Sequence, residues 1–181
     1  MLGSDSINLN TVQVLQVKHI ENQAGVFIKN FDKNNYERYG LNFDVSEDYF
    51  IVSHRNVLRG IHMQWPNPQK RLVSVIQGKF QLITVDLRKN LETFGESESF
   101  NLEAENPHLV YIPEGFGIGT LALLDNSIIH VMSSGTYIEE NGVGVCYNDK
   151  DLKIPWNSTS NPIVSDKDKN LLTLKEFKKR L

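Results

Sequence analysis

Short apolar runs, broken at close intervals by turn-forming residues, dominate the chain. In residues 80–86 the side chains alternate, so that Phe80 falls on one face and Ile83 on the other, which is the period of a β-strand. Residues 71–86 therefore predict two strands around a turn at 77–79. Further strands are predicted at 12–17, 25–31, 108–112, 120–124 and 127–133, separated by turn residues such as Pro113-Glu114-Gly115 and Asp125-Asn126.

Helical patterns are scarce. Residues 32–40 favour a short helix ended by Gly40, and residues 171–181 at the end of the chain are clearly helical. Many short strands with frequent turns are typical of an all-β sandwich or barrel. Small barrels carry ligands inside or at the mouth, and the inward-facing polar residues that the pattern nominates are Arg59, His62, Arg71 and Asp86.

Composition narrows the class of protein. With 181 residues, 40% hydrophobic and 23% charged, the chain is expected to be one globular domain spanning residues 1–181. A net charge of −3 without a long basic stretch argues against a nucleic-acid partner. No long apolar run or leader pattern is present, so we expect a cytoplasmic protein with no membrane partner. Cys146 is the only cysteine, which excludes a disulfide framework and a cysteine-based zinc site.

Seven segments resemble the dTDP-4-dehydrorhamnose 3,5-epimerase family, in the order and at the spacing of that family. Two examples are Val57-Leu58-Arg59-Gly60-Ile61-His62-Met63-Gln64 and Ile112-Pro113-Glu114-Gly115-Phe116. The resemblance implies a double-stranded β-helix, or jelly roll, of the cupin kind with a short C-terminal helix. It also implies a homodimer that acts in sugar-nucleotide and surface polysaccharide biosynthesis. The other segments are 69–78, 85–88, 93–95, 147–149 and 162–168.

The family's chemistry gives these residues a role. A 4-keto group acidifies the C–H bonds at C3 and C5 of a nucleotide-linked sugar, so a base can form an enolate without a redox cofactor or a metal. His62 matches the family's base and Asp168 the carboxylate that orients it. Arg59 and Arg71 match two cationic positions, for phosphate oxygens or for the enolate. The second is usually lysine, and arginine changes its hydrogen-bond geometry.

Two of these residues also have structural readings. Asp168 could cap a helix that begins near Lys169, because aspartate is a favoured N-cap residue. Arg59 could pair with Asp86 inside the barrel.

Part of the family pattern is changed. Val131 occupies the place of the family's proton-donating tyrosine, and Ile118 that of a histidine. His130 is adjacent, but strand alternation turns it to the other face unless the turn at 125–126 differs by one residue. Tyr49, Tyr137, His130 or a water molecule remain as candidate donors.

The expected substrate-binding set extends beyond the core motifs. The segment 24–31 resembles the strand that reaches the nucleotide site of a partner subunit, with Phe27 retained and Lys29 in place of a glutamate. The complete predicted set is Arg59, Arg71, Phe27, Lys29, Glu47, Tyr49, Gln64, Val131 and Tyr137.

Three functions are compatible with this pattern. The first is an epimerase acting on a nucleotide-linked 4-keto sugar, with C3 alone or both C3 and C5 inverted. The second is a ketoisomerase using the same base, and the third is a sugar-nucleotide-binding protein that has lost catalysis. A metal-dependent cupin oxygenase is disfavoured, because its His-x-His cluster would need a metal ligand at Gln64.

Overall fold

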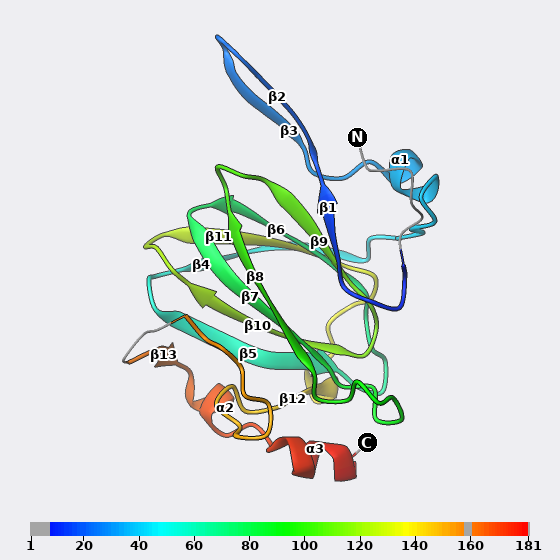
Figure 1. Ribbon diagram of the computed structural model, residues 1–181, viewed down its shortest axis with the longest axis vertical. Helices are drawn as coiled ribbons and strands as arrows, with labels where there is room; N and C mark the ends of the chain where they lie inside the picture. The colour runs from blue at the N-terminus through cyan, green and yellow to red at the C-terminus, as the bar shows by residue number, and fades with distance from the viewer. Residues whose placement is uncertain (1–7, 158–160, 181) are drawn as a thin grey trace.

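The computed structural model describes residues 8–157 and 161–180, and these form a sandwich of two antiparallel sheets (Figure 1). Within these ranges the first sheet has the order β1-β9-β6-β11-β4 and the second β12-β5-β10-β7-β8, with β13 parallel to β5. The first sheet comprises β1 (Gln13–Gln16), β9 (His108–Ile112), β6 (Arg71–Gln77), β11 (Ser127–Ser133) and β4 (Glu47–Ser53). The second comprises β12 (Gly142–Gly144), β5 (Val57–Gln64), β10 (Phe116–Ala122), β7 (Lys79–Asp86), β8 (Ser97–Glu103) and β13 (Ile163–Val164).

The connections between β4 and β11 give the topology of a jelly roll. Along the chain the strands cross repeatedly from one sheet to the other, so that β4, β6, β9 and β11 share one sheet and β5, β7, β8 and β10 the other. The all-β architecture predicted from the apolar pattern is therefore confirmed.

The apolar core lies between the sheets. Val73 and Ile129 from the first sheet meet Phe80 and Leu82 from the second, and all four are almost completely buried. The outer face of the second sheet is also covered, since Ile83 of β7 belongs to a cluster that includes Phe177 near the C-terminus. Both faces of β7 are therefore buried, although its sequence alternates.

The helices lie outside the two sheets (Figure 1). α1 (Lys33–Glu37) falls within the predicted segment 32–40, and α3 (Leu174–Arg180) confirms the predicted C-terminal helix. The apolar pattern missed the short helix α2 (Asp166–Lys169) and a 3-10 turn at Glu139–Asn141.

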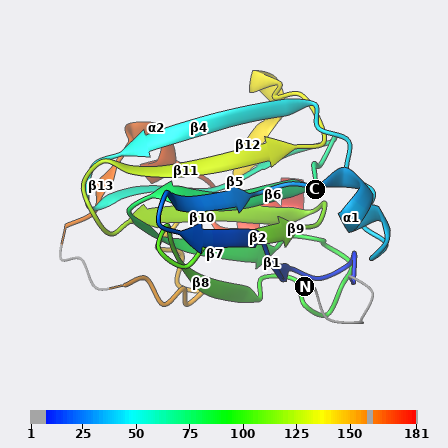
Figure 2. The same ribbon diagram turned by 90° about the horizontal axis from the view of Figure 1, so that it is seen from above.

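The segment 25–31 forms part of a separate hairpin. Among the described residues, β2 (Lys18–Asn22) and β3 (Gly25–Lys29) pair only with each other, and Figure 1 shows them projecting from the body of the sandwich. In Figure 2, which looks down from above, they lie over the strands of the body. Every residue of both strands is exposed.

The predicted strand at 120–124 is displaced. It is the second half of β10, which begins at Phe116 and pairs with both β5 and β7. Gly117 and Gly119 interrupt the run of apolar side chains, so the apolar pattern did not predict the first half of this strand. A Cβ atom at either glycine would lie within 3 Å of buried side chains, so close packing explains them.

Candidate functional site

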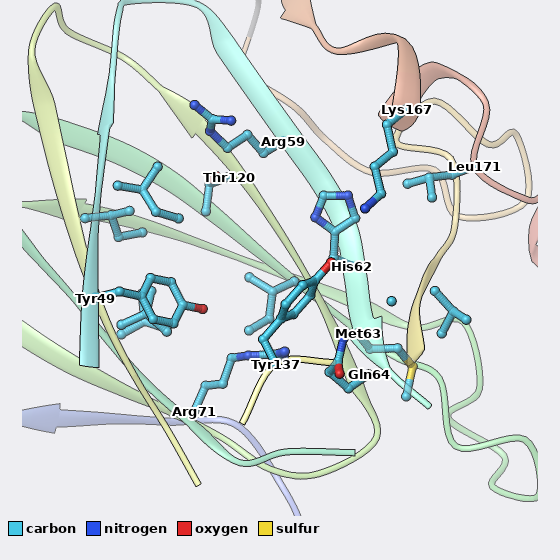
Figure 3. A pocket seen from close by; sticks show the side chains of 17 residues that line it. Tyr49, Arg59, His62, Met63, Gln64, Arg71, Thr120, Tyr137, Lys167 and Leu171 are labelled. Carbon is cyan, nitrogen blue, oxygen red and sulfur yellow. The ribbon is translucent and has the colours of Figure 1, made fainter. Parts of the chain in front are cut away.

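A cavity of about 240 Å³ opens between the two sheets and contains several of the predicted site residues (Figure 3). Strand β5 contributes Arg59, His62 and Gln64 to its wall. Alternation puts His62 and Gln64 on one face, and a register shift against β10 between Arg59 and His62 brings Arg59 to the same side. Strands β4, β6, β10 and β11, together with β12 and α2, complete the lining.

His62 and Asp168 form a hydrogen-bonded pair at this cavity. The distance from His62 Nε2 to Asp168 Oδ1 is 2.8 Å, and Asp168 Oδ2 accepts the backbone N–H of Gly60 at 3.1 Å. A carboxylate can only accept, so Nε2 carries the hydrogen and Nδ1 of the neutral ring keeps its lone pair. The histidine side chain is 43% exposed, whereas that of Asp168 is 5% exposed.

Asp168 is held by the short helix that the apolar pattern missed. The N-cap of α2 is Ser165, whose hydroxyl oxygen accepts the backbone N–H of Asp168 at 3.1 Å. The alternative that Asp168 itself caps a helix is therefore wrong. Burial alone would raise the pKa of Asp168, but the hydrogen bond and charge of His62, with the Gly60 N–H, hold that pKa below its ordinary value. The carboxylate is accordingly ionised at neutral pH.

Arg71 and Tyr49 face the cavity from the other sheet. Arg71 lies on β6 and Tyr49 on β4, and both side chains line the cavity. Burial lowers the pKa of Arg71, opposed by Tyr49 and by the nearby carboxylate of Glu47. Since the pKa of an arginine side chain starts far above neutral, the guanidinium stays charged. This wall therefore offers a fixed positive charge and a phenol.

The exposed side of the cavity is cationic and aromatic. Arg59 and Lys167 are exposed, and Figure 3 places them on either side of His62. Tyr137 lines the cavity from a loop, and its own backbone N–H donates to Glu47 Oε1 at 2.8 Å. Gln64 is buried and its Oε1 accepts the N–H of Ile138 at 2.9 Å, so its carbonyl oxygen holds the same loop in place.

The faces of β11 agree with the alternation expected for residues 130 and 131. Val131 lines the cavity, whereas His130 points out of the opposite face of the first sheet. Ile118 also lines the cavity, so both changed family positions contribute apolar side chains there.

Besides Asp168, which lies behind His62, four predicted residues do not line the cavity. One of them, Glu47, instead accepts the backbone N–H of Tyr137 beside it. Phe27 and Lys29 are on the projecting hairpin and do not line the cavity of this chain. Asp86, nominated as inward-facing, instead accepts hydrogen bonds from Arg88 Nε at 2.9 Å and Thr93 Oγ1 at 2.6 Å, outside the cavity. The predicted pairing of Arg59 with Asp86 is therefore wrong, because Arg88 occupies that carboxylate.

Some cavity residues were not singled out from the sequence. Lys167 is the most informative, and its signal was its position beside Asp168 in the motif at 162–168. Within residues 8–157 and 161–180, no three His, Cys, Asp or Glu side chains gather as a metal site would require, and no helix is long and apolar enough to span a membrane.

Comparison with known proteins gives a consistent result. The model of the family described as dTDP-4-dehydrorhamnose 3,5-epimerase matches residues 6–176. An enzyme of that name from Methanothermobacter thermautotrophicus is 34% identical over 171 residues, which are 93% of this chain and 92% of the relative. A dTDP-4-dehydro-6-deoxyglucose 3-epimerase from a Streptomyces species is 34% identical over 139 residues, covering 76% of this chain and 71% of the relative.

A solved structure supports the same assignment. The dTDP-4-dehydrorhamnose 3,5-epimerase from Bacillus anthracis, crystallised with TDP and PPi bound, has a TM-score of 0.87 at 31% identity, covering 93% of this chain and 97% of its own. The family model's match over residues 6–176 spans both sheets and the segments that carry His62 and Asp168. The jelly roll is thus of the cupin kind found in these epimerases, and the chain belongs to the dTDP-4-dehydrorhamnose 3,5-epimerase family.

Proposed function

We propose that this protein is a cofactor-independent epimerase that removes a proton beside the ketone of a nucleotide-linked 4-keto sugar. The observation that carries the proposal is the His62–Asp168 pair, which presents a free ring nitrogen to a cavity whose opposite wall holds Arg71. A base, a carboxylate behind it and a cation beyond the substrate are what enolate chemistry requires.

The proton transfer follows from the hydrogen bonds. Asp168 accepts the Nε2–H of His62, so the lone pair on Nδ1 takes the proton from the carbon beside the ketone. The ionised carboxylate then stabilises the imidazolium that forms. Arg71 faces the developing enolate oxygen with a charge that needs no rearrangement.

The exposed cations would hold the nucleotide's diphosphate. Arg59 and Lys167 lie at the open side of the cavity, and arginine and lysine are the usual partners of phosphate oxygens. The TDP bound to the Bacillus anthracis relative supports a nucleotide ligand for this chain.

The reaction scope has two forms, inversion at C3 alone or at both C3 and C5. The apolar side chains of Val131 and Ile118 in the cavity favour the narrower form, because the family's tyrosine and histidine are missing there. The similarity to a Streptomyces enzyme named as a 3-epimerase supports it as well.

Exchange of substrate hydrogens with heavy water tests the function. We expect dTDP-4-keto-6-deoxyglucose to take up deuterium at C3, followed by NMR, and the ratio of C3 to C5 uptake gives the scope. His62→Ala should abolish uptake while dTDP binding persists. His54→Ala, an exposed histidine outside the cavity, is the matched control.

The outcomes separate the alternative functions. No uptake by the wild type, with nucleotide bound, would indicate a binding protein that has lost catalysis. Uptake that leads to a 3-keto product would indicate a ketoisomerase. Uptake by His62→Ala at the wild-type rate would contradict the assignment of the base.

We further propose a homodimer in which the hairpin β2–β3 reaches the partner subunit. Val26, Phe27 and Ile28 are 56%, 57% and 43% exposed in one chain, and an apolar cluster of this kind is typical of an interface. Phe27 and Lys29 would then approach the partner's cavity.

Sedimentation at micromolar concentration tests the assembly. We expect a dimer, weakened by Phe27→Asp and unaffected by Leu124→Asp, an exposed leucine in the turn between β10 and β11. A wild-type monomer would contradict the proposal.

A further inference from the structure

Inversion needs a proton donor on the side of the sugar opposite His62, and the structure distinguishes among the side chains that could act. This step rests on the proposed function. His62 projects from β5 in the second sheet, so the opposite wall of the cavity belongs to the first sheet, β4, β6 and β11. Val131 lies on that wall, and its side chain has no acidic hydrogen.

His130 cannot take this part. Its Nε2–H donates to Asp48 Oδ1 at 2.6 Å and its Nδ1 accepts from Asn30 Nδ2 at 3.0 Å. Its ring also stacks on Phe50, with the centroids 4.7 Å apart. These partners lie on the outer face of the first sheet, so the histidine faces away from the cavity.

Tyr137 lies on the wrong wall. It is 52% exposed, and its hydroxyl group lies beside Gly142, close enough that a Cβ atom there would be 3.2 Å away. Gly142 belongs to β12, which pairs with β5 so that Gly144 is opposite His62. The Tyr137 hydroxyl group is therefore on the same side as the base.

Tyr49 occupies the required place. On β4 it is directly opposite Val131 of β11, and directly paired side chains in antiparallel strands lie about 5 Å apart at Cβ on the same face. Figure 3 shows its hydroxyl group pointing into the cavity, toward the side from which His62 projects. Arg71, on the other neighbour of β11, lines the same wall of the cavity, so its positive charge lies near the phenol.

We propose that Tyr49 is the proton donor. It would replace, from the neighbouring strand β4, the family's tyrosine that is absent at position 131 of β11. His62 Nδ1 takes the proton from the carbon, and the electron pair passes to the ketone oxygen as an enolate. The enolate carbon then takes the Tyr49 proton on its other face. Water returns a proton to the phenolate and removes one from the imidazolium, so the enzyme is restored without a co-reactant.

The surroundings of Tyr49 suit a donor that must be protonated at rest. Burial raises its pKa above the ordinary value of 10.0, while the nearby charge of Arg71 opposes the rise. The phenol is therefore intact at neutral pH, and the same arginine stabilises the phenolate that forms when it gives up the proton.

Removing one oxygen atom tests the assignment. We expect Tyr49→Phe to take up deuterium at C3 at the wild-type rate, because His62 and Asp168 are untouched, while net inversion falls by roughly 10²- to 10⁴-fold. Tyr147→Phe, a tyrosine outside the cavity, is the matched control and should change neither rate. In the Tyr49→Phe background, Val131→Tyr should restore inversion, since the two positions are paired neighbours.

Each outcome bears on the proposal. Inversion by Tyr49→Phe at the wild-type rate would overturn it, and so would an equal fall in uptake and inversion, which indicates a role in binding alone. Circular dichroism of each variant confirms that the fold is kept. A failure of the proposed function is distinct, because the wild type would then show neither uptake nor inversion.

Discussion

Asp168→Asn is the sharpest test of the catalytic pair, because it removes a charge while keeping the shape of the side chain. The two carboxylate oxygens accept from two donors, His62 Nε2–H at 2.8 Å and the Gly60 N–H at 3.1 Å. An asparagine has one acceptor oxygen and one amino group, so it cannot satisfy both donors. If the amino group faces His62, it forces the ring hydrogen onto Nδ1 and blocks the base.

The size of the effect follows from these contacts. A hydrogen bond to a charged group contributes about 1.5–3 kcal/mol, which corresponds to roughly 10- to 150-fold in the stability of the imidazolium. Any fraction of His62 with its hydrogen on Nδ1 is inactive as a base and lowers the rate further. The loss cannot exceed the whole contribution of general base catalysis to the rate. We therefore expect deuterium uptake at C3 to fall by roughly 10²- to 10⁴-fold.

The assay is NMR of substrate in heavy water, with thermal unfolding to verify the fold. Asp166→Asn is the matched control, since it makes the same charge change on the same helix at a side chain that is 93% exposed. Dissociation of dTDP should be unchanged in both variants. Uptake by Asp168→Asn equal to the wild type would refute the orienting role of this carboxylate.

Three further results are expected. Asp168 and Asp86 have pKa values held below the ordinary 3.8, so their contribution to stability is complete above that pH and is lost as the pH falls through the lower folded values. The free energy of unfolding, measured with urea across a pH series, should fall in this way. In Asp86→Asn the fall at acid pH should be smaller, and an unchanged fall would count against the pairing of Asp86 with Arg88. Gly144→Ala should destabilise by about 1–3 kcal/mol, because its Cβ would collide with the Ile61 carbonyl oxygen. Phe80→Ala, at a completely buried site, should cost about 3–5 kcal/mol by the same measurement.

The fold class could be predicted from the sequence because strand alternation is a local property. Residues 127–133 form β11 as predicted, and the glycine-containing turn at 77–79 separates β6 from β7. Where glycines interrupted the apolar pattern, as in the first half of β10, the prediction was displaced. Those glycines are required by close packing against residues distant in sequence, which a local pattern cannot show.

The catalytic candidates were found by motif, and the structure added their geometry. His62 and Asp168 are 106 positions apart, and only the packing of α2 against β5 places them 2.8 Å from each other. Within α2, Ser165 takes the N-cap position, which excludes the capping role for Asp168. For Asp86 the prediction from alternation failed. Its carboxylate was expected to face the cavity, but it instead accepts a hydrogen bond from Arg88, two residues later.

By itself the sequence determined the β architecture, the family resemblance and the choice of His62, Asp168, Arg59 and Arg71. Only the tertiary structure decided which of the candidate donor side chains line the cavity. Alternation shows that Val131 and His130 point in opposite directions, but the side that is inside depends on the pairing of β11 with β4 and β6. That pairing also puts Tyr49 opposite Val131, although 82 positions separate them in the chain. Hydrogen bonding between strands joins residues without regard to their separation in sequence, so a phenol lost from one strand can be replaced from the next.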